Sequence, residues 1–353
     1  MTGGRRARTW RPVALGAAAL VATAVTGGGT AWSTPGPSTS LASAPLAGAR
    51  LASTAPSSAY LPGTRCRAFP ADSWWHADVS HLPVSPRSAA WLSHMQATTR
   101  HLHADFGPSF GAQPVPYGIP ITVVKGAARV PVSFGYADES DRVRYPLSSS
   151  TRIEGGSAAT GDRHAIVVDA ATCTLFETWD THHRPTGWYA GSGAVWSLTS
   201  DTLRPAGWTS ADAAGLPILP GLLRYDEVAT GHVDHAIRFT TNVTDRSYLW
   251  PARHSAGSVS DRSYPPMGAR FRLRASFPIS SFTAQEQVVL RAMKTYGLVL
   301  ADNGSPWFFQ GTSDTRWSSR LVSDLARVPA SAFQAVDTAS LLVSPRSMAT
   351  KRG

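Results

Sequence analysis

The first 61 residues restrict where a folded core can form, because they contain five Arg, no acidic residue and no periodic apolar pattern. A basic run that includes Arg5 and Arg6 precedes an apolar stretch over 13–25, and a small-residue region follows. This order is typical of a secretory signal, and the apolar stretch is shorter than the ~20 residues that span a bilayer as a helix. We therefore predict a signal peptide over 1–33, no stable membrane insertion after its cleavage, and either the general secretory or the twin-arginine export route.

The composition changes again after the signal. Residues 34–61 are almost wholly Ser, Ala, Pro, Thr, Gly and Leu, which predicts a disordered linker. Aromatic and charged residues then arrive together after Cys66, and the remaining ~280 residues suit one large domain. We predict a single extracellular β-rich domain over 62–340 and a flexible basic tail over 341–353.

The charge of the chain says little about nucleic acids. The formal net charge is +10, but the five Arg of the first 61 residues supply half of it. A mild positive balance over nearly 300 residues does not indicate a nucleic-acid-binding surface. It is compatible with an acidic polysaccharide or an anionic cell envelope as partner, and it leaves the oligomeric state open.

Only two cysteines occur, Cys66 and Cys173. Export would place them in an oxidising compartment, where two thiols often pair. We expect one disulfide, with two separate buried thiols as the alternative. Neither residue has the spacing of a zinc or redox motif.

Short β-branched or aromatic runs dominate the folded part of the chain. Bounded by Gly, Pro, Asp or Ser, they predict strands at 121–124, 130–136, 164–169, 173–178, 194–198, 236–240, 248–250, 269–277 and 298–300. Helices are predicted over 86–102, over a segment that starts at the capping box of Thr283 and Glu286 and ends near Gly297, and over 318–328. These elements favour a β-sandwich or jelly-roll core with a few peripheral helices, or else an α+β fold with a single antiparallel sheet.

Several catalytic signatures are absent from the sequence. It has no Gly-rich phosphate loop, HExxH, CxxC or GxSxG motif, which argues against nucleotide chemistry, zincin proteolysis and ordinary esterase chemistry. His164, His235 and His254 could bind a metal with Asp226, but their spacing matches no metal-binding pattern. We predict neither a metal nor a cofactor.

The densest polar segment is the Gly-rich loop over 153–164, which leads into a predicted strand. Its glycines would let the backbone approach a ligand closely. Glu154 is the candidate acid or base, oriented by Asp162 and His164; a hairpin loop with local Asp–Arg pairing is the alternative. Glycoside hydrolysis needs two carboxyl groups ~5 to 9.5 Å apart, depending on the stereochemical outcome. We predict Glu154 with Asp226 or Glu227 as that pair.

Further candidates follow from strand periodicity and residue type. Glu177 and Trp179 share one face of a predicted strand, where they could protonate and stack a sugar, unless Glu177 pairs with an Arg on a solvated face. Arg270 and Arg272 alternate with apolar residues, which predicts a solvated basic face or a floor for carboxylate or sulfate groups. The other residues assigned to the site are catalytic His235 and substrate-binding Tyr225, Arg253, His254 and Trp307.

Much of the domain resembles one group of proteins. The runs 153–164, 209–228, 248–254, 265–277 and 296–307 are similar to uncharacterised secreted proteins of soil bacteria, of the actinobacterial type. The resemblance covers most of residues 66–340. It implies export and a single domain, and it carries over no catalytic residue.

Together these features favour a secreted carbohydrate-active enzyme, most simply a glycoside hydrolase that acts on an extracellular polysaccharide through two carboxylates. Ten of the twelve Trp follow residue 70, and aromatic faces are surfaces on which sugars stack. One alternative is a non-catalytic protein that binds glycans or the cell envelope. Another is a polysaccharide lyase, in which Arg neutralises a sugar carboxylate while His or Tyr225 moves protons.

Overall fold

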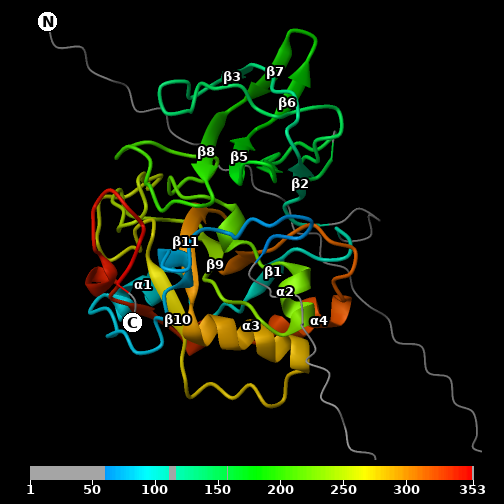
Figure 1. Cartoon of the computed structure of the whole chain (residues 1–353). Coiled ribbons are helices and arrows are strands. Elements are labelled where there is room, and N and C mark those ends of the chain that lie inside the picture. The colour runs from blue at the N-terminus through cyan, green and yellow to red at the C-terminus, as the bar shows by residue number, and fades with distance from the viewer. Residues whose placement is uncertain (1–59, 111–116, 157, 352–353) are drawn as a thin grey trace, which may run out of the picture.

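The computed structural model describes residues 60–110, 117–156 and 158–351. The predicted signal peptide and nearly all of the predicted linker lie outside these ranges. The described chain is rich in strands, which form three sheets of mixed strand direction, and it has few helices (Figure 1). The β-rich class is therefore confirmed, whereas the sandwich or jelly-roll order and the single antiparallel sheet are not.

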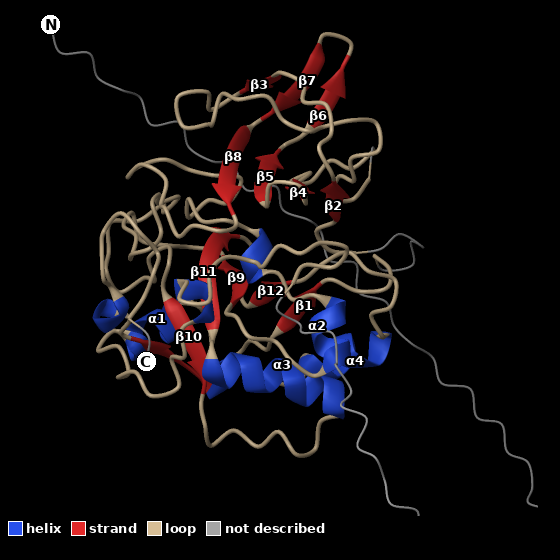
Figure 2. Cartoon of the chain, viewed as in Figure 1, coloured by secondary structure: helices blue, strands red, loops and turns tan. Residues whose placement is uncertain are grey.

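The largest sheet has the strand order β1-β12-β9-β11-β10-β13. Its strands are β1 (His103–Asp105), β9 (Ile237–Thr241), β10 (Arg270–Leu273), β11 (Leu298–Asn303), β12 (Phe308–Gln310) and β13 (Phe333–Val336). The helices lie on the same side of the molecule as this sheet (Figure 2) and are α1 (Ser88–His94), α2 (Tyr225–Thr230), α3 (Ala284–Thr295) and α4 (Ser319–Leu325). Short 3-10 turns cover Trp74–His76, Leu219–Gly221, Ala330–Ala332 and Ala339–Leu341.

The two smaller sheets form the other end of the molecule, where the figures show strands and loops without helices (Figure 2). The four-stranded sheet has the order β2-β4-β5-β8, with β2 (Ile121–Val124), β4 (Ala165–Asp169), β5 (Thr174–Trp179) and β8 (Ser192–Ser197). The three-stranded sheet has the order β3-β7-β6, with β3 (Val132–Phe134), β6 (His182–Arg184) and β7 (Gly187–Ala190).

The central strands of the four-stranded sheet, β4 and β5, are buried on both faces. Ile166 and Leu175 pack into the main hydrophobic core, which also contains residues of the six-stranded sheet. Val167 and Phe176 point the opposite way, into a second cluster around Tyr145. Strand alternation thus divides the side chains between two clusters and attaches this sheet to the rest of the fold.

Helix α3 shows how local sequence sets an element. The hydroxyl of Thr283 accepts the amide of Glu286, and the carboxylate of Glu286 accepts the amide of Thr283 at 2.8 Å, which completes the predicted capping box. Gly297 follows the helix with φ 76°, and a Cβ there would lie 2.4 Å from the carbonyl oxygen of Phe271. The predicted start and end of this helix are confirmed.

Other sequence-based boundaries were wrong. The helix predicted over 86–102 covers only Ser88–His94, and 248–250 is a loop joined to Met267 by an isolated bridge. Helix α2 was not predicted; it begins at Tyr225, where Glu227 caps its start, and Gly231 ends it in the left-handed region. The segment assigned to a flexible tail is anchored to the fold at Met348, which is buried and whose carbonyl accepts the amide of Trp74 at 2.7 Å.

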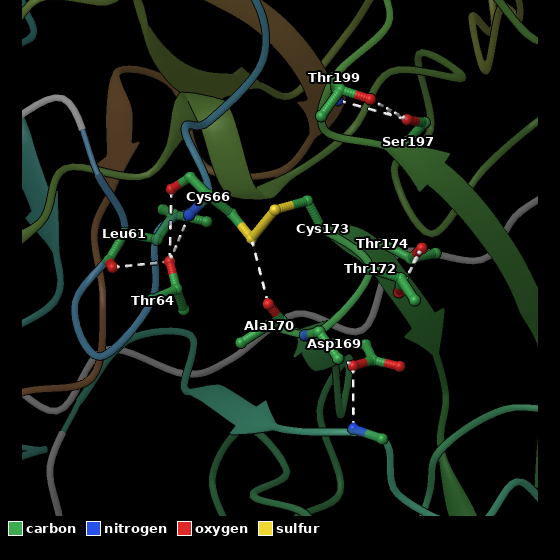
Figure 3. Close-up of a disulfide and its surroundings, with 12 residues drawn as sticks. Leu61, Thr64, Cys66, Asp169, Ala170, Thr172, Cys173, Thr174, Ser197 and Thr199 are labelled. Carbon is green, nitrogen blue, oxygen red and sulfur yellow. Dashed lines mark hydrogen bonds between the residues drawn. A yellow bond between two sulfur atoms is a disulfide. The ribbon is translucent and has the colours of Figure 1, made fainter.

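The expected disulfide between Cys66 and Cys173 is present, with 5.4 Å between the two Cα atoms (Figure 3). It ties the segment that precedes the first helical turn to the start of β5. Within the part of the chain that the structure describes, none of the helices has the length and apolar character needed to cross a bilayer.

Removing the disulfide should destabilise the fold. The bridge joins residues 107 positions apart, and constraining so long a loop is worth up to ~4 to 5 kcal/mol in the chain-entropy model. We expect the double variant Cys66→Ala/Cys173→Ala to lose free energy of unfolding in urea on this scale, and reductant to shift the wild-type midpoint to the same position. An unchanged midpoint in both would contradict a stabilising role.

Candidate functional site

The described chain gathers ionisable side chains where the four-stranded sheet meets the six-stranded one. We call this group the junction cluster and define it by seven residues: Glu154, Asp162, His164, Glu177, Asp212, Arg238 and Asp302. They come from the loop before β4, from β5, from the connection after β8, and from β9 and β11. The contacts given below link these segments, so the cluster spans the boundary between the sheets.

His164 is the best-defined member of the junction cluster. Its Nδ1 lies 2.6 Å from Oε2 of Glu154, and its Nε2 lies 3.2 Å from the carbonyl oxygen of Ala211. Both ring nitrogens therefore face acceptors, which requires that both carry a proton. Burial on its own lowers the pKa of His164, but the Glu154 carboxylate outweighs it and raises the pKa to about 9.

The second cation of the cluster is Arg238 on β9. Its Nη2 lies 3.2 Å from Oδ1 of Asp212, and both side chains are fully buried. The same Nη2 lies 3.9 Å from Oδ2 of Asp302, whose side chain is 18% exposed. Nη1 of Arg238 has no hydrogen-bond partner among the described residues, so this buried guanidinium still has donor capacity.

The two partly exposed carboxyl groups near Arg238 have opposite electrostatic surroundings. Burial and the neighbouring Asp212 carboxyl raise the pKa of Asp302 to about 8, although Arg238 acts in the opposite direction. Burial also acts to raise the pKa of Glu154, but the His164 imidazolium outweighs burial and lowers it. Burial raises the pKa of Asp212 as well. The site therefore combines two neighbouring carboxyl groups, Asp212 and Asp302, that together retain a proton at neutral pH with a Glu154 carboxylate that has lost its proton.

Glu177 differs from its predicted role. Its side chain is fully buried, and its carboxylate accepts the amides of Ile218 at 3.0 Å and Leu219 at 2.8 Å. Burial raises the pKa of Glu177 to about 7. It therefore neither touches a sugar beside Trp179 nor pairs with an Arg on a solvated face, because its strand face points into the main core.

Trp179 lies at the edge of the junction cluster. Its side chain is half-buried, and its indole N–H donates to Oδ1 of Asp162 at 3.2 Å. The ring of Tyr136 lies 6.3 Å away, measured between centroids. Two aromatic rings thus stand beside an exposed carboxylate, which is a surface of the kind that sugars stack on.

A further carboxyl group, absent from our sequence-based candidates, interacts electrostatically with Glu154. Asp105 ends β1, where it accepts hydrogen bonds from the hydroxyl of Tyr117 and, at 3.2 Å, from Nε2 of Gln310. Burial raises its pKa, and the charge of Glu154 acts in the same direction. Asp105 and Tyr117 therefore border the same site.

The carboxylates proposed as partners of Glu154 lie in other surroundings. Glu227 is buried, with one oxygen on Arg224 and the other 3.1 Å from Nε2 of His235. Asp226 forms an exposed ion pair with Arg316 at 2.7 Å. Neither makes a contact with Glu154 among the described residues.

The predicted arginine floor was wrong. Arg270 is fully buried and donates to the carbonyl oxygens of Trp74 and Tyr296, each at 2.7 Å. Arg272 donates to the carbonyl oxygens of the segment 79–82. Because the chain around 74–82 covers this face of β10, the guanidinium groups hold backbone and are unavailable to a ligand.

The remaining predicted binding residues have structural contacts. Trp307 is fully buried and donates to the carbonyl oxygen of Met95 at 2.9 Å, so it is part of the core and not a cleft wall. Arg253 donates to the carbonyl oxygen of Arg204, and Nδ1 of His254 lies 2.8 Å from the carbonyl oxygen of Ala213. The ring of Tyr225 packs against Trp317.

No cluster of three or more His, Cys, Asp or Glu side chains arranged to hold a metal ion occurs among residues 60–110, 117–156 and 158–351. A scan against protein-family models finds no match, and searches of curated proteins and of solved structures find no significant one. The site is therefore interpreted from its own geometry.

Sequence reasoning identified part of the junction cluster. It singled out Glu154, Asp162 and His164, which the structure brings together, but it missed Asp212, Arg238 and Asp302. One signal was available: Arg238 is the only charged residue in the run 236–240, which was predicted as a strand. A charge inside such a strand must find a buried partner, and that partner is Asp212.

The His164–Glu154 pair can be tested by titration. Because the pKa of folded His164 lies near 9, above its ordinary value near 6.5, the stabilisation from this pair is fully present below pH ~6.5 and is lost as pH rises through about 9. In Glu154→Gln we expect the pKa of His164, followed by NMR of the ring nitrogens, to fall well below 9, because burial is then opposed only by the weaker effect of more distant carboxylates such as Asp162. A pKa that stays near 9 in the variant would show that Glu154 is not the cause.

Proposed function

We propose that this chain is an exported glycoside hydrolase that acts on an extracellular polysaccharide, with its active centre at the junction cluster. The observation that carries the proposal is the pair Glu154 and Asp302. Both are partly exposed, with 25% and 18% of their side-chain surface accessible, and both interact electrostatically with Arg238. Their pKa values are displaced in opposite directions, as an acid and base pair requires.

In this proposal Asp302 is the general acid. A carboxyl group with a pKa of about 8 keeps its proton at neutral pH and can donate it to the glycosidic oxygen as the bond breaks. Its location at the end of β11, beside an exposed turn, makes the proton accessible from solvent.

Glu154 then acts as the carboxylate that attacks the sugar or activates a water. The His164 imidazolium holds Glu154 ionised and fixes its position through a 2.6 Å contact. Asp302 thus replaces Asp226 and Glu227 as the proposed partner of Glu154, since Arg316 and the Arg224–His235 pair engage those two side chains.

The surroundings favour hydrolysis over the alternatives. The lyase alternative placed its arginine floor on Arg270 and Arg272, and both are bonded to backbone carbonyls instead. A binding module needs no pair of displaced carboxyl groups, and such pairs are concentrated at catalytic sites. The disulfide is compatible with the oxidising compartment that export provides.

Substituting either carboxyl should abolish turnover. We expect Glu154→Gln and Asp302→Asn each to lower kcat on the cleaved polysaccharide by at least about 100-fold, the usual scale of acid–base catalysis, while unfolding remains cooperative. Release of reducing ends from a panel of neutral and acidic polysaccharides is the measurement. The matched control is Asp324→Asn, because Asp324 is a surface carboxyl on α4 paired with Arg320. Asp226→Asn distinguishes the pair Glu154 and Asp302 from the pair Glu154 and Asp226 predicted from the sequence. If Asp226→Asn lost turnover while Asp302→Asn stayed active, the assignment of Asp302 would be overturned.

The dependence of turnover on pH gives an independent test. Activity requires ionised Glu154 and protonated Asp302, so kcat/KM should rise through a pKa below the ordinary value for Glu and fall through a pKa of about 8. In Asp302→Asn the residual activity should lose the alkaline limb. An alkaline limb that persists there would assign the acid to another group.

A further inference from the structure

A cavity of about 570 Å³ lies directly beside the segment that carries Glu154. Arg152, Ile153, Gly155 and Gly156 line it, whereas the carboxylate of Glu154 is bonded to His164. Glu154 itself does not line the cavity, although residues on either side of it do. A polymer whose reacting unit sits at Glu154 would reach this cavity with a neighbouring unit.

The lining of the cavity is cationic. Two Arg and one His contribute to it, and it includes neither Asp nor Glu. The guanidinium of Arg163 is held in the wall by the carbonyl oxygens of Ala159 at 2.8 Å and Thr181 at 2.9 Å. This wall is positioned by the same loop that presents Glu154.

Arg152 supplies the accessible charge. It is exposed, and among the described residues its guanidinium makes neither a hydrogen bond nor an ion pair. An acidic residue within its electrostatic range is Asp314, whose two oxygens are bonded to Arg316 at 2.6 and 3.0 Å. The fork of Arg152 thus retains donors matched to a planar carboxylate.

The rest of the lining suits a sugar ring. Hydroxyl groups come from Ser148, Ser149 and Thr151, and Trp188 supplies an aromatic wall. His183 packs against Trp188 in a tilted arrangement, with 4.7 Å between ring centroids. The volume falls within the ~300 to 1,000 Å³ range of small-molecule sites.

We propose that this cavity binds a carboxylate-bearing sugar unit of the polysaccharide, with the carboxylate on Arg152. The proposal names the substrate class of the proposed hydrolase, a uronic-acid-containing polymer, and in that respect rests on the proposed function. The binding site itself is tested without turnover.

The probes are short oligosaccharides of galacturonate, glucuronate and mannuronate, each compared with its carboxyl-methyl ester by isothermal titration calorimetry on the folded full-length domain. The ester keeps the ring and removes the charge, so at least one acid should bind at least about tenfold more tightly than its ester. Arg152→Gln should abolish that preference. Ser149→Glu should also abolish the preference, because it adds a negative charge to the cavity wall at a hydroxyl that makes no hydrogen bond among the described residues. Arg320→Gln on α4 is the control and should leave the preference unchanged.

Other outcomes overturn the inference. Equal affinity for every acid and its ester would do so, as would a preference that survives both Arg152→Gln and Ser149→Glu. If only sulfated oligosaccharides bound in an Arg152-dependent way, and more tightly than the uronate oligosaccharides, the site would recognise sulfate and not a sugar carboxylate. Hydrolysis confined to neutral polysaccharides would leave the proposed function standing and overturn this site, whereas Arg152-dependent binding of an acid that is never cleaved would support the site and contradict the hydrolase.

Discussion

The ion pair between Arg238 and Asp212 is the interaction around which the junction of the two larger sheets is organised. Both side chains are fully buried, so each charge has lost its hydration. At 3.2 Å and an effective dielectric constant of about 20, their attraction is about 5 kcal/mol, comparable with the several kcal/mol that burial of each ion costs. The pair therefore adds little net stability, although loss of one partner would cost about 3 to 5 kcal/mol.

The Arg238–Asp212 pair instead sets the electrostatic surroundings of Asp302 and Glu154. Both residues lie within electrostatic range of Arg238. Burial and Asp212 raise the pKa of Asp302, whereas His164 lowers the pKa of Glu154. Glu177 joins β5 to the segment that follows Asp212, because its buried carboxylate accepts hydrogen bonds from the amides of Ile218 and Leu219. The proposed chemistry thus depends on groups that no solvent-exposed surface could keep in these protonation states.

The sequence predicted those parts of this arrangement that depend on local patterns. The capping box at Thr283 and Glu286, the strand runs around β4 and β5, and the pairing of Cys66 with Cys173 all follow from spacing or residue type. The three-sheet arrangement did not follow, because parallel pairs such as β9 with β11 join segments about 60 residues apart. Arg270 and Arg272 show the same limit: their alternation was correct, but the covering segment 74–82 is remote in sequence.

The most direct test of this account is the protonation of Asp302 and Glu154 in the folded protein, read from carboxyl carbon NMR shifts across pH 3 to 10. The account predicts that Asp302 titrates near pH 8 and that Glu154 titrates below the ordinary range for Glu. If Asp302 titrated near pH 4 with Glu154 at or above it, neither residue could hold its assigned role, and the junction cluster would not be an acid–base site.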